Sequence, residues 1–216
     1  MAAERPTPTG PLSPDLTIVE SRVYRGPNVW SYEKSIHLVV DLGVLEGYPT
    51  DTIPLFTDKL LELLPGLQRH ACSRGRAGGF VERLREGTWL GHVAEHMALQ
   101  LQTEAGHDQR RGKTRGVRGT TGRHNVIYGY TDETVGLAAG RFATRLVNHL
   151  VSAEEGFDFD TELNAFLRLA ERTAFGPSTA AIIEEAVSRD IPWIRLNSAS
   201  LVQLGQGVHP NASGRR

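Results

Sequence analysis

The sequence predicts an α+β protein, in which a small N-terminal domain with a short sheet packed by helices precedes a partial α/β segment. Short runs of β-branched residues alternate with longer stretches that carry apolar residues at helical spacing, as expected where strands and helices are mixed. Beyond residue 159, helices are followed by a strand, which is the rhythm of an α/β domain. The length of 216 residues allows one medium domain and part of a second.

The composition excludes several classes of protein. Lys plus Arg number 24 against 25 Asp plus Glu, so the net charge of −1 argues against a globally basic nucleic-acid binder. The single cysteine excludes a disulfide scaffold and any site built from several thiolates. The chain has no run of about 18 apolar residues and no export signal, which predicts a soluble, cytoplasmic protein without a membrane-spanning segment.

The first elements follow from local composition. Residues 1–16 contain four prolines among small polar residues, and we expect a disordered tail there. Strands are predicted over 18–24 and 37–42, because both runs are rich in β-branched and other apolar residues. A helix is predicted to begin near Pro54, because leucines recur at helical spacing after it, and to stop at the Pro-Gly pair of 65–66.

Residues 88–103 form the most strongly patterned segment of the chain. Apolar residues recur along one face of the predicted helix, and Thr88 is predicted to cap its first turn. Residues 106–122 lack apolar periodicity and are rich in glycine and arginine, so we expect a loop there. A strand over 125–130 and an amphipathic helix over 135–151 follow.

These elements define an N-terminal domain over 17–151. Residues 152–159 are acidic and have no apolar pattern, which predicts a linker. Two further helices and the strand of 191–196 make up the partial α/β segment of 160–207, and a polar tail over 208–216 ends the chain.

His92 and His96 are the sharpest candidates for chemistry. Four residues apart on a helix, they lie about one turn apart on the same face, where both can reach one divalent ion. With Glu95 they spell H-x-x-E-H, the order of the inverted zincins, in which the histidines hold zinc and the glutamate takes a proton from bound water. These three residues therefore predict a zinc site with Glu95 as the catalytic base.

Two questions about this site stay open in the sequence. A catalytic zinc needs a third protein ligand, and the chain offers several unplaced candidates: Glu82, Glu104, His70 and Cys72. Gln100, one further turn along the helix, is a poor ligand. The alternative interpretation is that the histidines and Glu95 are hydrogen-bonded in a cleft or face water, with no metal.

Basic residues are concentrated in and just after the expected loop: Arg110, Arg111, Lys113, Arg115, Arg118 and Arg123. Guanidinium groups match carboxylates or phosphates, and neighbouring glycines let an extended ligand approach the backbone. A polycarboxylate ligand is at least as natural as a nucleic acid, because no stacking aromatic residue is interleaved with the charges before Tyr128. The alternative is a solvated, mobile loop without a ligand.

Several sequence blocks stand in a fixed order along the chain: Arg25-Gly26-Pro27-Asn28, Gly78-Gly79-Phe80-Val81-Glu82-Arg83, Gly91-His92-Val93-Ala94-Glu95-His96, Asn125-Val126-Ile127-Tyr128 and Ile191-Pro192-Trp193-Ile194-Arg195-Leu196. Together they resemble the N-terminal module of the cyanophycin synthetase family, over roughly residues 18–207. So many blocks in the same order make the resemblance highly specific.

The resemblance implies a function for the family as a whole. Its members make a polymer with a poly-aspartate backbone that carries arginine on each side-chain carboxyl. A central ATP-grasp domain adds Asp and a C-terminal Mur-ligase-like domain adds Arg, both with ATP and Mg²⁺. The N-terminal module holds the growing polymer, and in some members it cuts polymer into primers at a metal-dependent peptidase site.

For this chain, the resemblance implies that His92 and His96 bind zinc and that Glu95 is the general base. The polymer would be bound by the basic residues named above together with Glu82. Residues 160–207 would be the incomplete start of the ATP-grasp region, so the ligase sites, ATP and Mg²⁺ are not expected on this chain.

The chain departs from the family at two positions. Gln100 stands where members often have Glu, and Gly129 stands where they have an acidic residue between two tyrosines. If either missing carboxylate serves the metal or the substrate, peptidase activity is expected to be weak or absent here. The alternative function is a non-catalytic polymer-binding or docking subunit for separately encoded ligase domains. The oligomeric state is left open, a homo-oligomer included.

Overall fold

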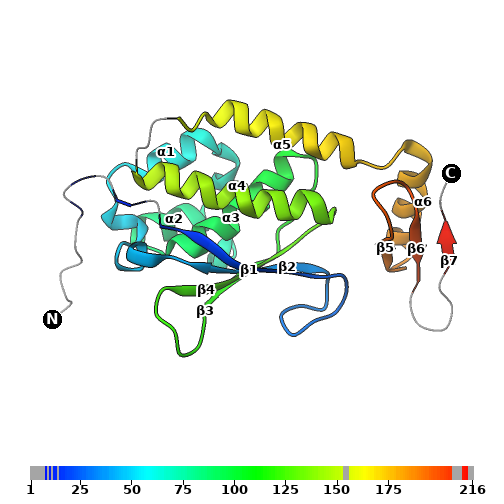
Figure 1. The fold of residues 1–216 in the computed structure, drawn as a ribbon, viewed down its shortest axis with the longest axis horizontal. Coiled ribbons are helices and arrows are strands. Elements are labelled where there is room, and N and C mark those ends of the chain that lie inside the picture. Colours follow the sequence, from blue (N-terminus) through cyan, green and yellow to red (C-terminus); the bar gives the residue numbers. More distant parts are fainter. Residues whose placement is uncertain are drawn as a thin grey trace. The chain divides into compact units, whose positions relative to one another are not determined.

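The computed structural model describes residues 8, 10, 12–13, 15–152, 156–205 and 211–213. The chain forms two compact units, divided between Leu167 and Arg168, and each unit is described by itself. Figure 1 shows the order of the elements along the chain.

The first unit is built on a sheet of four antiparallel strands in the order β1-β2-β4-β3. The strands are β1 (Thr17–Tyr24), β2 (Ser35–Asp41), β3 (Gly112–Gly116) and β4 (Arg123–Gly129). The predicted strands over 18–24, 37–42 and 125–130 are confirmed as β1, β2 and β4.

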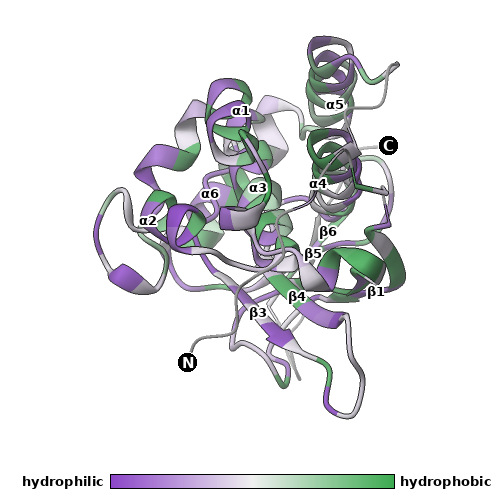
Figure 2. Ribbon diagram, turned by 90° about the vertical axis from the view of Figure 1, so that its left-hand side faces the viewer, coloured by the Kyte–Doolittle hydropathy of each residue, from purple (hydrophilic) through white to green (hydrophobic). Residues whose placement is uncertain are grey.

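Helices cover one face of this sheet (Figure 1). They are α1 (Phe56–Leu63), α2 (Gly79–Glu86), α3 (Leu90–Glu104) and α4 (Glu133–Ser152), with 3-10 helices η1 (Gly43–Gly47), η2 (Thr50–Thr52), η3 (Pro65–Arg69) and η4 (Cys72–Arg74). Twelve of the fifteen residues of α3 are buried, because this helix contacts both the sheet and α4. Figure 2 shows hydrophobic residues along α3 and α4.

The sheet and α4 share one core. In β2, Ile36, Leu38 and Val40 are buried on the same face, because side chains two residues apart lie on one side of a strand. Two glycines let α4 approach this face. A Cβ on Gly136 would lie 2.5 Å from Ile36 Cδ1, and one on Gly140 would lie 2.6 Å from Leu38 Cδ1.

Two of the predicted local features are wrong. Residues 106–122 are not one loop, because they contain β3, whose Thr114 pairs with Val126 at the edge of the sheet. An edge strand with polar, mostly exposed side chains needs no apolar run, so hydrophobic patterning misses it. Thr88 is not the N-cap of α3. Trp89 occupies that position, and the Thr88 N–H donates to Thr50 Oγ1.

The second unit begins within α5 (Phe159–Thr173) and continues with α6 (Pro177–Ser188). Three short antiparallel strands follow in the order β5-β6-β7: β5 (Trp193–Arg195), β6 (Val202–Leu204) and β7 (Asn211–Ser213). The Arg195 guanidinium lies 4.0 Å from the Phe175 ring centroid and holds the segment after β5 by donating to the Ala199 carbonyl. The predicted strand over 191–196 is confirmed as β5.

The expected domain boundaries stay predictions, and the two tails, the linker and the end of the partial α/β segment lie partly outside the described residues. In the expected tail of 1–16, the Leu12 N–H donates to the Val151 carbonyl, and buried Leu16 exchanges backbone hydrogen bonds with the Asn148 side chain. Towards the C-terminus, residues 153–155, 206–210 and 214–216 lie outside the described part of the chain. Among the described helices, none is both long enough and apolar enough to cross a membrane.

Candidate metal centre

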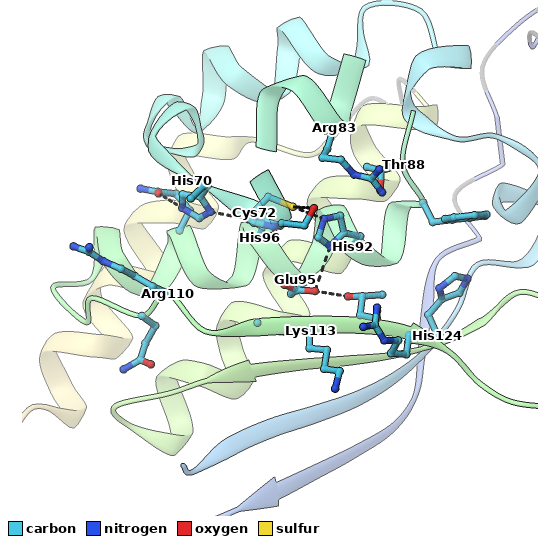
Figure 3. Close-up of a pocket in the computed structure, with 18 of the residues that line it drawn as sticks. His70, Cys72, Arg83, Thr88, His92, Glu95, His96, Arg110, Lys113 and His124 are labelled. Atoms are coloured by element: carbon cyan, nitrogen blue, oxygen red, sulfur yellow. Dashed lines mark hydrogen bonds and ion pairs between the residues drawn. The ribbon is translucent and has the colours of Figure 1, made fainter. Parts of the chain in front are cut away.

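A pocket of about 1120 Å³ opens between α3, the segment that contains η3 and η4, and the edge strand β3 (Figure 3). Its walls join parts of the first unit that are far apart in the sequence. One wall is the polar face of α3, which places these side chains in the pocket: His92, Glu95, His96 and Gln100.

Cys72 joins His92 and His96 in a cluster of three side chains that can ligate a metal. One ligand atom of each residue lies within 4.8 Å of the other two. Cys72 Sγ is 3.2 Å from His92 Nε2, and the two imidazole centroids are 4.7 Å apart. Cys72 begins η4 with a left-handed φ of 50°, a backbone conformation uncommon outside glycine. The turn at η4 thus delivers the thiol to the polar face of α3.

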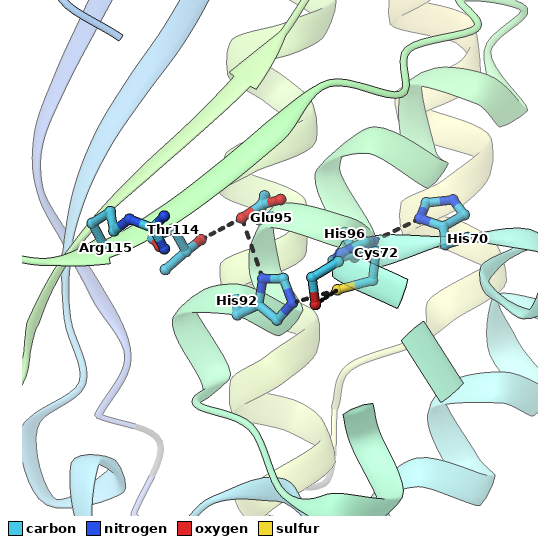
Figure 4. A network of polar contacts seen from close by, with 8 residues as sticks. His70, Cys72, His92, Glu95, His96, Thr114 and Arg115 are labelled. Atoms are coloured by element: carbon cyan, nitrogen blue, oxygen red, sulfur yellow. Dashed lines mark hydrogen bonds and ion pairs between the residues drawn. The ribbon is translucent and has the colours of Figure 1, made fainter. Parts of the chain in front are cut away.

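Glu95 is the buried carboxylate of the site (Figure 4). Its Oε2 lies 3.3 Å from His92 Nδ1 and accepts a 2.5 Å hydrogen bond from Thr114 Oγ1. Gly112 lets the carboxylate lie against β3, because a Cβ at that position would overlap Glu95 Oε1. Strand β3 therefore holds Glu95, and Glu95 engages one nitrogen of His92 while the other faces Cys72.

His96 is held by aromatic and polar partners. The Phe80 ring stacks on its imidazole, with 3.9 Å between centroids and 19° between planes. His96 Nδ1 lies 2.8 Å from His70 Nδ1, and His70 Nε2 lies 2.9 Å from Gln100 Oε1. Gln100 Nε2 in turn donates to Glu104 Oε1 over 2.7 Å. These contacts occupy Nδ1 of His96, so Nε2 is the nitrogen left for a ligand.

The electrostatics of the cluster favour a charged pair of Cys72 and His92. Burial opposes a charge on His92, but hydrogen bonds to Cys72 and Glu95 outweigh it and raise the pKa of His92 to about 9. Burial also opposes a thiolate, but the hydrogen bond from His92 prevails and lowers the pKa of Cys72. Burial and the neighbouring histidine charges lower the pKa of His96 to about 2, so its ring is neutral.

The residues of the cluster fit a zinc ion. Thiolate sulfur and imidazole nitrogen are ligands that zinc prefers, and a tetrahedral site spaces them by about 3.4–3.8 Å. The Cys72–His92 separation of 3.2 Å is close to this spacing, and the whole cluster lies within 4.8 Å. Three protein ligands leave a fourth position for water or substrate, which is typical of catalytic zinc sites.

The structure separates the basic residues that were predicted to bind substrate. Four of them line the pocket: Arg110, Lys113, Arg115 and Arg123. Thr114 reaches Glu95, so alternation along β3 directs the side chains of Lys113 and Arg115 away from Glu95, although both residues still line the pocket. Figure 3 shows the Lys113 side chain pointing away from Glu95.

Three further predicted contacts lie outside the described lining of the pocket. Arg111 forms an ion pair with Glu33 over 2.9 Å, and Glu82 forms one with Arg76 over 2.5 Å. Arg118 is exposed in the turn between β3 and β4. These three side chains are not brought together with the histidines of α3.

The fold places two groups beside the H-x-x-E-H motif, of which Cys72 was an unplaced candidate in the sequence and Thr114 was not a candidate. Of the four candidates for a third ligand, the structure places Cys72 beside the two histidines and His70 behind His96. Thr114 was not predicted, because only the pairing of β3 in the sheet brings its hydroxyl to Glu95. Nothing in the local sequence around Thr114 marks this role.

The chain belongs to the cyanophycin synthase-like N-terminal domain family, which it matches over residues 37–152. That range contains every residue of the cluster, and the match confirms the family resemblance in the sequence. The chain is 42% identical over 198 residues to a cyanophycin synthetase of Synechocystis sp., and 41% identical over 198 residues to one of Geminocystis herdmanii. These alignments cover 90% of this chain but only 23% and 22% of the two relatives. The chain therefore spans less than a quarter of the length of these relatives.

Proposed function

We propose that this chain binds an arginyl-aspartate polymer, the product named by its synthetase relatives, and cleaves it at a zinc site in the pocket. The single observation that carries the proposal is the placement of Cys72, His92 and His96 together, with Glu95 beside them, at the wall of a pocket of about 1120 Å³. The synthetic, ATP-dependent chemistry would belong to the parts of the relatives that this chain does not match.

The proposed ligands are the Cys72 thiolate and the Nε2 atoms of His92 and His96. Zinc, when bound there, would polarise the scissile carbonyl and acidify its bound water. Glu95 would accept the proton of the attacking water and deliver it to the leaving amine as the C–N bond breaks. The Thr114 hydroxyl, which donates to Glu95 Oε2, would hold the carboxylate in place for this transfer.

The rim of the pocket suits a polymer that carries both charge signs. Arg110 pairs with the exposed Asp108, and Arg123 pairs with the partly exposed Asp41, each over 2.9 Å. Exposed ion pairs contribute little to stability, so both arginines can exchange their partners for ligand carboxylates. The released aspartates would then face the guanidinium groups of the same polymer.

The two departures from the family have a structural account. Gln100 contacts His70 and Glu104, so it supports the site through hydrogen bonds in place of ligating a metal. Gly129 is buried in β4, and a Cβ there would lie 2.5 Å from Gln109 Oε1. Neither position is needed for the three-ligand cluster, which supports the peptidase proposal.

Metal content and polymer cleavage test the proposal together. Purified protein is loaded with zinc, its metal stoichiometry is measured, and released fragments of the polymer are followed by mass spectrometry. We expect one zinc per chain and fragments that disappear with a chelator. Glu95→Gln keeps an acceptor for His92 Nδ1, so it should retain stoichiometric zinc and lose cleavage, whereas Glu62→Gln, a change on the exposed side of α1, should alter neither. Absence of stoichiometric zinc, together with cleavage unchanged in Glu95→Gln, overturns the peptidase proposal.

The second candidate function is polymer binding or docking without cleavage, favoured by the exposed arginines at the pocket rim. It predicts retention of the polymer without released fragments. Under both functions, Arg110→Ala combined with Arg123→Ala should weaken polymer binding, whereas Arg118→Ala, outside the described pocket lining, should leave it unchanged. A steeply salt-dependent affinity for DNA or RNA in place of polymer binding would contradict both.

A further inference from the structure

We propose that Glu104, Gln100 and His70 form a hydrogen-bond chain of fixed direction, which makes His96 Nδ1 a donor and so presents His96 Nε2 as the metal-binding atom. These three are positioning residues for the metal site. The expected effect on zinc binding rests on the proposed function. The direction of the hydrogen bonds does not, because it is a property of the metal-free protein.

The direction of the chain is set at Glu104. A carboxylate only accepts hydrogen bonds, so the Gln100 side chain must turn its NH₂ group towards Glu104, over 2.7 Å. The amide oxygen of Gln100 then faces His70 Nε2 at 2.9 Å. Because an amide oxygen only accepts, His70 Nε2 carries the proton of that hydrogen bond.

The direction passes from His70 to His96. The hydrogen-bond partners of His70 are an amide oxygen and an imidazole nitrogen, and neither is a carboxylate that would hold a second proton, so the ring is neutral and has one N–H group. That N–H lies at Nε2, which leaves Nδ1 as an acceptor. His96 Nδ1, 2.8 Å away, must therefore donate. A neutral His96 with its proton on Nδ1 has its lone pair on Nε2, the form that binds a metal.

Packing around the hydrogen-bond chain prevents the Gln100 side-chain amide from turning. Gly66 of η3 lies directly against the Gln100 side chain, since a Cβ at Gly66 would overlap the amide nitrogen and lie 2.7 Å from its oxygen. Gln100 is buried, and the stacked Phe80 ring fixes the plane of His96. The position of each hydrogen-bonding group is therefore determined by covalent geometry and contact.

The two proposed histidine ligands are thus oriented by separate carboxylates. Glu95 accepts directly from His92 Nδ1, at 3.3 Å, and leaves Nε2 of that ring facing Cys72. Glu104 acts on His96 through two intervening side chains. Outer partners of this kind fix the tautomer and the ring orientation of metal-binding histidines, and their loss reduces metal affinity by about 10–100-fold.

Nitrogen NMR of the metal-free protein, labelled with ¹⁵N-histidine, directly tests the direction of the hydrogen bonds from His96 to Glu104. Protonated and unprotonated imidazole nitrogens have distinct chemical shifts. We expect His96 protonated at Nδ1 and His70 protonated at Nε2. If His96 is protonated at Nε2 in the wild-type protein, the inference is overturned, whether or not the protein binds zinc.

A variant at Gln100 tests whether the hydrogen-bond chain determines the His96 tautomer and the affinity for zinc. Gln100→Leu should mix the His96 tautomers and weaken zinc binding by about 10–100-fold. Gln109→Leu removes an amide of the same pocket that bonds to Thr131, and it should change neither the tautomer nor the zinc affinity. An unchanged tautomer and zinc affinity in Gln100→Leu contradict the inference. The expected tautomers in a wild-type chain that holds no zinc would support the hydrogen-bond chain and refute the metal function.

Discussion

Cys72 Sγ lies 3.2 Å from His92 Nε2, although the two residues are twenty positions apart in the sequence. Two local features make this contact. Cys72 takes a left-handed φ of 50° at the start of η4, and His92 lies on the pocket face of α3. Since the histidine can reach the thiol only when η4 packs on α3, the contact links the ligand cluster to the tertiary fold.

Replacing Cys72 by alanine removes the proposed sulfur ligand. We expect zinc affinity to fall by more than about 100-fold, because losing a direct ligand costs more than losing an outer partner. Zinc should raise the melting temperature of the wild-type chain, since a ligand that binds only the folded state stabilises it, and the rise should vanish in Cys72→Ala. Ser73→Ala, at the exposed neighbouring position, is the control. An equal rise in both variants would exclude Cys72 as a ligand.

Thr114→Val removes the hydroxyl that donates to Glu95 but keeps the shape of the side chain. The cleavage rate should fall by about tenfold or more, because hydrogen bonds to charged groups contribute about 1.5–3 kcal/mol. Zinc stoichiometry should not change, since Thr114 is not a ligand. Polymer-fragment release and metal analysis measure the two quantities. Thr120→Val, elsewhere on the pocket lining, should cleave at the wild-type rate. Equal rates in the two variants would remove Thr114 from the mechanism.

Gly140→Ala should destabilise the first unit. The added methyl group would overlap Tyr128 Oη and lie 2.6 Å from Leu38 Cδ1, in a core with no room to relax. Overpacking of this kind costs about 1–3 kcal/mol in free energy of unfolding, which urea denaturation measures. Gly26→Ala, where an added Cβ meets nothing within 4 Å, should stay within about 0.5 kcal/mol of the wild type. A Gly140→Ala chain as stable as Gly26→Ala would show that α4 lies farther from the sheet.

Because of Lys34, the free energy of unfolding should change with pH in the alkaline range. Burial lowers its pKa to about 8 from the model-peptide value of 10.5, against the attraction of Asp132, while its Nζ donates to the Thr131 carbonyl over 2.9 Å. Between these two pKa values the unfolded chain binds more protons than the folded chain, so the free energy of unfolding rises with pH across this window. Lys34→Gln should remove this rise, which is on the order of 3 kcal/mol for a pKa lowered from 10.5 to about 8. Urea titrations of both chains at several pH values check it, and parallel stability curves would contradict the prediction.

The sequence predicts the fold where local pattern and burial coincide. The apolar runs of β2 and the stripe of α3 identify both elements to within two residues, because each buries a continuous apolar face. Strand β3 could not be predicted in this way. Its GKTRG sequence has no apolar face, and it is a strand only because β4 offers a partner for its backbone.

The same distinction between local pattern and tertiary packing applies to the candidate site. His92, Glu95 and His96 are placed together by helical spacing alone, so the sequence predicts their common face. Cys72 and Thr114 reach that face from other segments, and their positions depend on how η4 and β3 pack against α3. Local patterns carry no information on such contacts, which explains why the third ligand stayed open in the sequence.

The contact between Cys72 and His92 also has a mechanical consequence. A metal ion held by both residues would be a reversible cross-link, closing the loop from Cys72 in η4 to His92 in α3, which lie twenty positions apart in the sequence. Closing a loop restricts the unfolded chain, so zinc would stabilise this segment beyond its local contacts. Backbone amides from η4 to the first turn of α3 would then exchange with solvent as one cooperative unit, opening only when the metal leaves.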